Sequence, residues 1–375
     1  MIDRKGTLGV VGAGTMGAGI AQVALEAGWR VRLHDALPGA AERGRERIAD
    51  GLRRRAARRG LAFDAERAWV QACLSRLAVA PDPAAVAAGA DLVIEAIVED
   101  LEAKRTLFSA LDAAAGPETI LATNTSALSV SAIAAAAAHH PGRVTGLHFF
   151  NPAPVLLLVE VVAAEQTDPG VLDRAAGIVG AWGKTPVRSA DSPGFIVNRV
   201  NRPFTIEPLR MVETGEARAG VIDAAVRADG FPMGPFELMD LVGLDVNLAA
   251  ATGVWEGLGR PERLRPSPIQ AWLVEHQRLG RKAGVGFYRY HDGRDPALEP
   301  LPHEVARPVR VGHALAPEAI VRRIRTAIAA EAVLARDAGV ASEADIDTAL
   351  WLGAAHPEGP FAWLRRHHRA AGAPP

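Results

Sequence analysis

A glycine-rich turn near the N-terminus constrains the fold of this 375-residue chain more than any other feature. The segment Gly12–Gly17 (GAGTMG) follows the apolar run Thr7–Val11 and leads into an Ala-rich helical stretch. This spacing lets the backbone turn sharply and approach a pyrophosphate at the helix N-terminus. A second apolar run ends at Asp35, whose carboxylate can accept hydrogen bonds from ribose hydroxyls and would repel a 2′-phosphate. The pattern favours NAD over NADP, and the alternative is a strand–helix turn that binds nothing.

Short apolar runs continue to alternate with helical stretches as far as about residue 185. This alternation predicts an α/β fold with a Rossmann-type, doubly wound sheet. From about Ser192 helical segments dominate, which predicts an all-α C-terminal region. The expected strands are Thr7–Val11, Val31–Asp35, Leu92–Glu95, Ile120–Thr123, Val144–His148 and Val155–Val162.

The helical region contains an internal repeat. The order Glu, Gly, Ile-Asp, Gly-Pro-Phe begins at Glu207 and again at Glu331, and the first two spacings are identical. Chance similarity between Ala-rich helices is the alternative, but several rarer residues match in one order. We therefore expect a nucleotide-binding domain over residues 1–188, a first helical copy over 189–290, a Pro-rich linker over 291–317 and a second copy over 318–375.

Composition excludes several classes of function. The formal net charge is −1, so no global basic field exists to hold nucleic acid. The single cysteine, Cys73, rules out an intrachain disulfide framework. We expect neither a membrane span nor a signal peptide, and hence a cytoplasmic protein. The adjacent pairs His139-His140 and His367-His368 lack partners at metal-ligand spacing, so no metal is expected.

His148 and Glu160 form the clearest catalytic constellation. His148 ends an apolar strand, where ligands meet doubly wound sheets, and Glu160 lies inside an otherwise apolar run. A buried carboxylate needs a partner, and an imidazole across a turn can supply one. Such a pair can remove a hydroxyl proton, because the carboxylate fixes the imidazole tautomer and raises its basicity. The alternative is a structural histidine with an edge glutamate facing water.

Several further blocks of sequence resemble one enzyme family. They are Ile94–Asp100 with Lys104, Asn124–Ser126, Gly146–Pro154, Leu158–Val162, Gly183–Pro186, Asp191–Arg199 and Gly280–Tyr288. This ordered set resembles the L-3-hydroxyacyl-CoA dehydrogenases, including the 3-hydroxybutyryl-CoA dehydrogenases, over residues 5–290. The second helical copy is similar to an extra C-terminal copy in some bacterial members. The resemblance implies oxidation of an L-3-hydroxyacyl-CoA with NAD, in fatty-acid β-oxidation or related acyl-CoA metabolism.

The resemblance also implies roles for individual residues. It makes His148 the catalytic base, Glu160 its orienting partner, and Ser126 and Asn198 polar contacts to the reacting oxygen. The implied NAD contacts are Gly12, Gly14, Thr15, Met16, Gly17, Asp35, Glu99, Lys104, Ser126, Asn151 and Lys282. The implied coenzyme A contacts are Gly51, Arg58 and Ser126.

The residues taken alone leave other interpretations open. Ser126 could belong to an N-cap for a helix starting near Ser129, and Asn198 could be an ordinary helix residue. Glu99 and Lys104 could form a pair on a helix surface. The Arg53–Arg59 cluster could be a solvated helix face or a seat for coenzyme A phosphates.

Two positions depart from the family pattern. Leu156-Leu157 stands where relatives commonly carry Met-Lys, which removes a charge near the active-site strand. Pro208 lies inside an expected helix and is predicted to kink or break it.

Two rival functions also remain: a dehydrogenase of a free hydroxy acid, similar to the L-gulonate and λ-crystallin relatives, and an NAD-binding protein without turnover. Whether two chains pair as a homodimer stays open.

Overall fold

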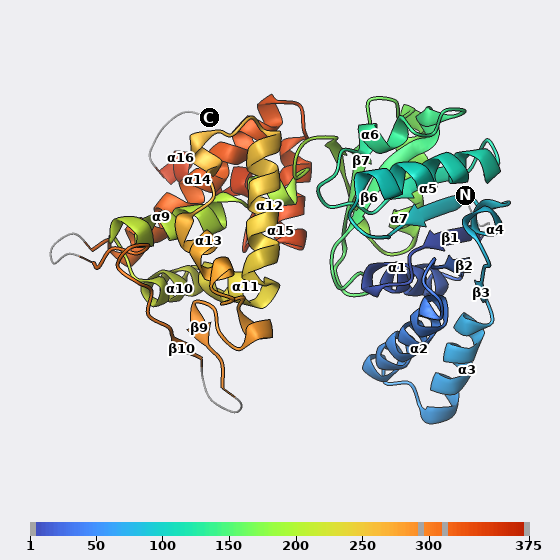
Figure 1. The fold of residues 1–375 in the computed structure, drawn as a ribbon, viewed down its shortest axis with the longest axis horizontal. Helices are drawn as coiled ribbons and strands as arrows, with labels where there is room; N and C mark the ends of the chain where they lie inside the picture. The colour runs from blue at the N-terminus through green and yellow to red at the C-terminus, as the bar shows by residue number, and fades with distance from the viewer. Residues whose placement is uncertain (1–4, 292–295, 310–313, 371–375) are drawn as a thin grey trace. The chain divides into compact units, whose positions relative to one another are not determined.

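The computed structural model describes residues 5–291, 296–309 and 314–370, and divides the chain into two compact units between Ser192 and Pro193. The first unit is a sheet with helices between its strands, and the second is helical (Figure 1). A Rossmann-like sheet followed by an all-helical region confirms the predicted fold class.

An eight-stranded sheet forms the centre of the first unit, in the order β3-β2-β1-β4-β5-β6-β7-β8. Its strands are β1 (Thr7–Val11), β2 (Arg30–His34), β3 (Leu77–Val79), β4 (Leu92–Glu95), β5 (Ile120–Thr123), β6 (Val144–Phe149), β7 (Leu158–Ala163) and β8 (Thr185–Ala190). Neighbouring strands run parallel except β6 and β7, which are antiparallel. β1, β4, β5 and β6 are buried along their whole length, because helical connections cover both faces of a parallel sheet.

The helices of the first unit are α1 (Thr15–Glu26), α2 (Ala40–Arg58), α3 (Phe63–Leu74), α4 (Pro83–Ala87), α5 (Leu101–Ala114), α6 (Val130–Ala134) and α7 (Pro169–Ala181), with a 3₁₀ turn η1 (Pro141–Arg143). Side-chain caps fix where several of them begin. Asp100 accepts from the Ala103 amide at the start of α5, and Ser129 accepts from the Ala132 amide at the start of α6.

Two expected strand boundaries were wrong, and two strands were missed. The strand predicted over Val155–Val162 begins only at Leu158, because the Lys184 ammonium donates to the Ala153 and Leu156 carbonyls and holds the preceding loop. The strand predicted to begin at Val31 and end at Asp35 instead spans Arg30–His34. β3 has only three residues, and β8 carries a proline that only an edge strand tolerates, so neither gives a clear apolar run.

The second unit contains α8 (Val197–Val200), α9 (Pro203–Thr214), α10 (Ala219–Ala228), α11 (Pro235–Val242), α12 (Leu244–Gly257), η2 (Glu262–Leu264), α13 (Pro268–Glu275), η3 (Arg281–Ala283), the short strands β9 (Tyr288–Arg289) and β10 (Ala297–Leu298), α14 (Pro317–Asp337), α15 (Glu343–Gly353) and α16 (Pro360–Ala370). Within the described ranges, no single helix is long and apolar enough to cross a membrane; α11 and α12 pass that test only as a pair bent by 102°.

The expected break at Pro208 does not occur. α9 runs without interruption from Pro203 to Thr214 and packs against α14. Pro208 removes one backbone donor, the one that would serve the Phe204 carbonyl, and the rest of the helix remains. Tertiary packing of a buried helix therefore outweighs the local cost of the proline.

The second unit has two halves, which comprise helices α8–α13 and α14–α16. Both halves contain the same hydrogen-bonding arrangement at a helix N-terminus. The Asp223 carboxylate accepts from the backbone amides of Phe236 and Glu237 at the start of α11. The Asp347 carboxylate accepts from the amides of Phe361 and Ala362 at the start of α16. Each aspartate thus satisfies helix N-terminal donors that would otherwise have no partner. A Cβ added to Gly234 or Gly359 would overlap the respective carboxylate, which explains the glycine in both Gly-Pro-Phe segments.

Reciprocal ion pairs join the two halves. Arg199 Nε donates to Glu331 at 2.9 Å, and Arg323 Nε donates to Glu207 at 2.9 Å. In each half the arginine stands eight residues before the glutamate. The arginine of each half contacts the glutamate of the other half, so the same pair of repeat positions meets twice. That reciprocity is the signature of a two-fold, isologous contact.

We predict unequal losses of stability when the two glutamates are neutralised. Glu331→Gln takes the carboxylate from the buried Arg199 guanidinium and should lower the free energy of unfolding by about 3–5 kcal/mol. Glu207→Gln should cost about 1 kcal/mol or less, because Arg323 is one-third exposed and keeps Glu216 as a partner. Urea unfolding of both variants checks this, and equal losses would contradict the buried geometry.

His356 is buried between the two halves, where its Nε2 donates to Asn201 Oδ1 at 2.8 Å. Burial, together with the nearby Arg325 charge, lowers the pKa of His356 from 6.5 to about 3. The folded state therefore binds fewer protons than the unfolded state between pH 3 and 6.5, so stability falls as the pH drops through this window.

We predict that His356 makes the protein acid-sensitive. Between pH 7.5 and pH 5 the histidine should remove about 2 kcal/mol from the free energy of unfolding. His356→Gln keeps a donor for Asn201 but does not titrate, so its stability should fall less over the same interval. Chemical unfolding at the two pH values measures the difference, with His140→Gln at an exposed position as the control.

Candidate active site

The glycine-rich turn between β1 and α1 has the geometry of a phosphate cradle. Gly12 has a φ of +102°, and a Cβ there would lie 2.3 Å from the Ala96 carbonyl oxygen. A Cβ on Gly17 would lie 1.8 Å from the Gly12 oxygen, so this glycine permits the close approach of helix and turn. Gly14, in contrast, faces open space. No described side chain caps α1 and its first turn holds no acid, so the helix N-terminus is left for an anion.

Asp35 lies just beyond the end of β2, beside this turn. Its Oδ2 accepts from the Ala13 amide at 2.8 Å and its Oδ1 from the Leu37 amide at 2.9 Å. The backbone thus fixes the carboxylate next to the cradle while leaving lone pairs for other donors. An adenosine ribose fits this acceptor set, so the residues present suit NAD.

His148 and Glu160 face each other across the antiparallel pair β6–β7. They are directly opposite in register, and His148 Nδ1 lies 2.5 Å from Glu160 Oε2. The glutamate side chain is fully buried and that of the histidine is 8% exposed. A carboxylate at Nδ1 places the imidazole proton there, so Nε2 carries the lone pair. The Phe150 ring packs 4.4 Å from the imidazole and helps to fix its orientation.

A buried cluster of charges lies at the carboxyl ends of β4 and β5. The Lys104 ammonium contacts Glu95 at 2.6 Å and Glu99 at 3.1 Å. Hydroxyls complete the cluster: Thr123 donates to Glu95, and Thr125 donates to Glu99. Lys104 is almost completely buried, so it does not form a surface pair with Glu99. Because its ammonium is held by two carboxylates, Lys104 positions Glu99.

Glu99 links this cluster to the predicted Ser126. Its Oε1 accepts from the Ser126 backbone amide at 3.0 Å. Burial acts to raise the pKa of Glu99, but the Lys104 charge and the hydrogen bonds from Thr125, Lys104 and Ser126 outweigh it and lower the pKa. Glu99 is therefore an anion at neutral pH. Ser129, and not Ser126, caps the following helix, so Ser126 is not needed for that role.

A cavity of about 340 Å³ lies between α1, α2 and the loop before β7. Gly51, Arg54, Arg55, Arg58 and Asn151 are among the residues that line it. Arg53 instead pairs with Asp50, and Arg59 lies near Glu26, so the arginine cluster divides between cavity and surface. Gly51 has a packing reason as well: a Cβ there would lie 2.0 Å from Gln22 Oε1.

Two predicted residues belong to the second unit. Asn198 lies in α8, where its backbone carbonyl accepts from Arg202 Nε at 2.8 Å. Lys282 lies in η3, where its ammonium contacts both oxygens of Asp245 at 2.5 and 2.6 Å. Their contacts with the first unit stay predictions.

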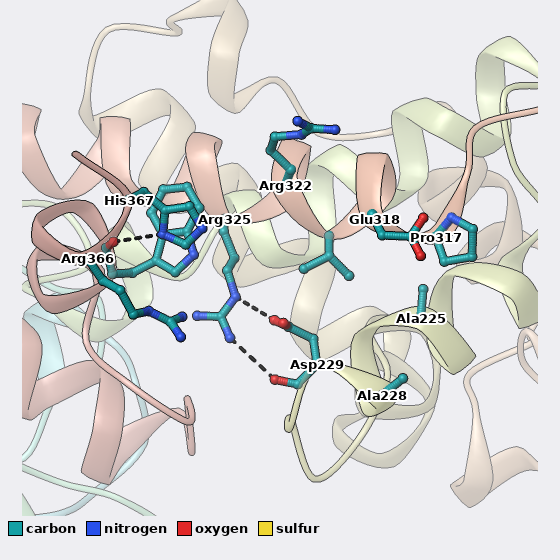
Figure 2. Close-up of a pocket in the computed structure, with 11 residues that line it drawn as sticks. Ala225, Ala228, Asp229, Pro317, Glu318, Arg322, Arg325, Arg366 and His367 are labelled. Carbon is teal, nitrogen blue, oxygen red and sulfur yellow. Dashed lines mark hydrogen bonds and ion pairs between the residues drawn. The ribbon is translucent and has the colours of Figure 1, made fainter. Parts of the chain in front are cut away.

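A larger cavity, of about 660 Å³, lies in the second unit between α10, α14 and α16. Figure 2 shows Arg325 of α14 directed at Asp229 on its wall, with Arg322 on the same helix and Arg366 on α16. By the repeat spacing, Arg322 occupies the position that corresponds to Asn198 in the first copy. None of the predicted catalytic or NAD-binding residues lines this cavity, so its size does not make it the active site.

Sequence reasoning missed Glu95, although it is the buried residue that anchors Lys104. The available signal was a lone acid at the carboxyl end of the apolar strand β4, the edge at which ligands meet such sheets. A buried carboxylate there requires a cation, and the next lysine in the chain supplies it.

Comparison with known proteins identifies the family. Residues 7–192 match the NAD binding domain of 3-hydroxyacyl-CoA dehydrogenase, and residues 194–290 match the C-terminal domain of the same enzyme. A 3-hydroxyadipyl-CoA dehydrogenase of Escherichia coli is 38% identical over 95% of this chain and 90% of that protein. The human mitochondrial hydroxyacyl-coenzyme A dehydrogenase is 42% identical, and the match covers 75% of this chain and 90% of the human protein.

Solved structures agree with the sequence matches. The crystal structure of a 3-hydroxybutyryl-CoA dehydrogenase from Escherichia coli superposes with a TM-score of 0.85 at 36% identity, covering 97% of this chain and 92% of that chain. The (S)-3-hydroxybutyryl-CoA dehydrogenase of Ralstonia eutropha gives a TM-score of 0.72 at 32% identity, covering 77% and 100%. The chain belongs to the 3-hydroxyacyl-CoA dehydrogenase family.

Proposed function

We propose that the protein oxidises an L-3-hydroxyacyl-CoA to the 3-ketoacyl-CoA with NAD, and catalyses the reverse reaction. The observation that carries this proposal is the buried His148–Glu160 pair. It lies in the same unit as the glycine-rich turn between β1 and α1, whose geometry suits the phosphates of a nucleotide. NAD, when bound, accepts a hydride from the substrate carbon. The hydroxyl proton must leave in the same reaction, which needs a base near the carboxyl edge of the sheet.

His148 serves as that base through Nε2. Glu160 holds the proton on Nδ1, orients the ring and stabilises the imidazolium that forms. In the reverse direction the imidazolium returns the proton to the oxygen. Ser126 and Asn198 donate to the substrate oxygens and polarise the carbonyl during reduction.

The remaining assignments concern the two ligands. Glu99, held by Lys104, accepts from a cofactor hydroxyl, while Asn151 and Lys282 contribute further cofactor contacts. Gly51 and Arg58 line a basic cavity suited to the phosphates of coenzyme A. A free hydroxy acid would have no use for that cavity, which favours the acyl-CoA over the free-acid alternative.

The second helical half is part of the proposal. We infer that it duplicates the first and occupies the surface that would otherwise pair with a second chain, because the ion pairs between the halves are reciprocal. We place the activity in fatty-acid or related acyl-CoA metabolism in the cytoplasm.

We predict that the catalytic pair can be separated by mutation. His148→Gln should lower kcat for reduction of acetoacetyl-CoA by about 10³- to 10⁴-fold, because no group then transfers the proton. Glu160→Gln should cost less, about 10- to 100-fold, because the imidazole remains but loses its fixed tautomer. NADH consumption measures both, and fluorescence titration should show unchanged NADH binding. Full turnover by His148→Gln would refute the assignment.

We predict that the arginines of the α2 cavity bind the nucleotide end of coenzyme A. The double variant Arg54→Ala/Arg58→Ala should raise the KM for acetoacetyl-CoA by about tenfold, because charged hydrogen bonds to phosphate are lost. The KM for acetoacetyl-pantetheine, which lacks the nucleotide, should not change. Arg53→Ala is the matched control, since Arg53 does not line the cavity and its side chain is 58% exposed. An equal effect on both thioesters would place the coenzyme elsewhere.

A further inference from the structure

The cavity between α10, α14 and α16 takes no part in the proposed reaction. Its volume of about 660 Å³ exceeds that of the α2 cavity, about 340 Å³, and lies within the usual range for small-molecule sites. Every residue that lines it belongs to the second unit. The cavity is therefore complete without the nucleotide-binding unit, and its lining can be analysed by itself.

Two of the three arginines at this cavity are held by carboxylates. Arg325 donates from Nε to Asp229 at 2.5 Å and from Nη1 to Glu358 at 3.4 Å. Arg366 donates to the same oxygen of Glu358, so the two guanidinium groups converge. Arg366 is 63% exposed, and this one contact leaves most of its five N–H donors for other acceptors.

Two further charged residues have unused hydrogen-bonding capacity. Glu318 and Arg322 are exposed and lie on successive turns of α14, as Figure 2 shows. Oppositely charged residues four positions apart on a helix often pair. In the described part of the chain, neither Glu318 nor Arg322 forms an ion pair or a side-chain hydrogen bond. The cavity thus offers a cation and an acceptor that the protein itself does not use.

Much of the remaining wall is apolar. Ala225 and Ala228 of α10 and Val321 of α14 line the cavity, together with the largely buried Trp363 of α16. Small side chains on a helix leave a smooth surface against which a planar ring can lie. The wall therefore suits a ligand with one anionic part and one flat, weakly polar part.

The internal repeat shows that the helices do not need these charges. Glu318, Arg322 and Arg366 correspond, by the repeat spacing, to Gly194, Asn198 and Leu241 in the first copy. None of those three counterparts is charged, yet the first copy builds the corresponding helices. The second copy therefore carries a charged lining where the first copy carries a neutral one, and ligand binding accounts for that difference.

We propose that this cavity binds an adenosine diphosphate moiety at a site separate from the active site. Arg322 and Arg366 take the diphosphate, because a guanidinium matches phosphate through paired hydrogen bonds. The adenine ring lies on the wall formed by Ala225 and Val321, and Glu318 accepts from the hydrogen-bond donors of the adenosine. A fatty acid would also fit a cationic end and an apolar wall, but its chain has no donor for Glu318.

Two coenzymes could supply this moiety. NAD and coenzyme A both contain adenosine diphosphate, as does the free nucleotide. The test therefore counts the equivalents of labelled ADP, coenzyme A and NADH that the full chain binds in equilibrium dialysis. Binding requires no turnover, so the result does not depend on the proposed function.

The variant for this test restores the residues of the first copy. Arg322→Asn/Arg366→Leu should bind one equivalent of ADP fewer per chain than the wild type. A matching loss for coenzyme A or for NADH identifies the source, and a loss for ADP alone identifies the free nucleotide. Arg365→Leu is the control, because Arg365 is 56% exposed on the same helix and does not line the cavity. Equal ADP stoichiometry in the wild type and the double variant overturns the inference.

A single variant tests how the ligand is oriented. Glu318→Ala should weaken ADP binding at this site by about tenfold, because hydrogen bonds to a charged acceptor are lost. Inorganic pyrophosphate lacks the adenosine, so its ability to compete with labelled ADP at this site should not decrease. Unchanged ADP affinity in Glu318→Ala, or an equal loss for ADP and pyrophosphate, contradicts the assignment of the adenosine to Glu318.

Discussion

The candidate active site depends on the one antiparallel step in an otherwise parallel sheet. A parallel neighbour of β6 would need a long crossover, whereas β7 returns after a short loop and places Glu160 directly opposite His148. Cross-strand partners have fixed separation, so the imidazole and carboxylate meet without depending on a mobile loop. The register thus gives the fully buried carboxylate an imidazole partner.

The same logic applies to the charges at the ends of β4 and β5. Glu95 and Lys104 would each be costly to bury alone, and together with the partly exposed Glu99 and two threonine hydroxyls they satisfy one another. Their mutual constraint gives Glu99 a fixed orientation and a permanent negative charge beside Ser126. A surface pair at the same sequence spacing would have neither property, because side-chain entropy and solvent screening would loosen it.

The sequence could predict the fold class, five strands to within one residue at either end, and the pairing of His148 with Glu160. These features rest on local periodicity and on residue types whose burial demands a partner. It could not predict β3 and β8, which lack an apolar run, or the late start of β7, which depends on the distant Lys184. The continuity of α9 through Pro208 was missed for a similar reason, since packing against α14 outweighs the local rule. Glu95 had a signal in its position at the end of β4, and the next lysine along the chain, Lys104, is its partner.

Corresponding positions of the two helical halves agree at some contacts and differ at others. Positions that hold the halves together are retained in both, as the reciprocal pairs of Arg199 with Glu331 and Arg323 with Glu207 demonstrate. Other positions differ between the halves. Asn198 corresponds there to Arg322, and Arg202 corresponds to Thr326. The half that carries Asn198 is thus also the half that buries Arg202, and the other half replaces both residues.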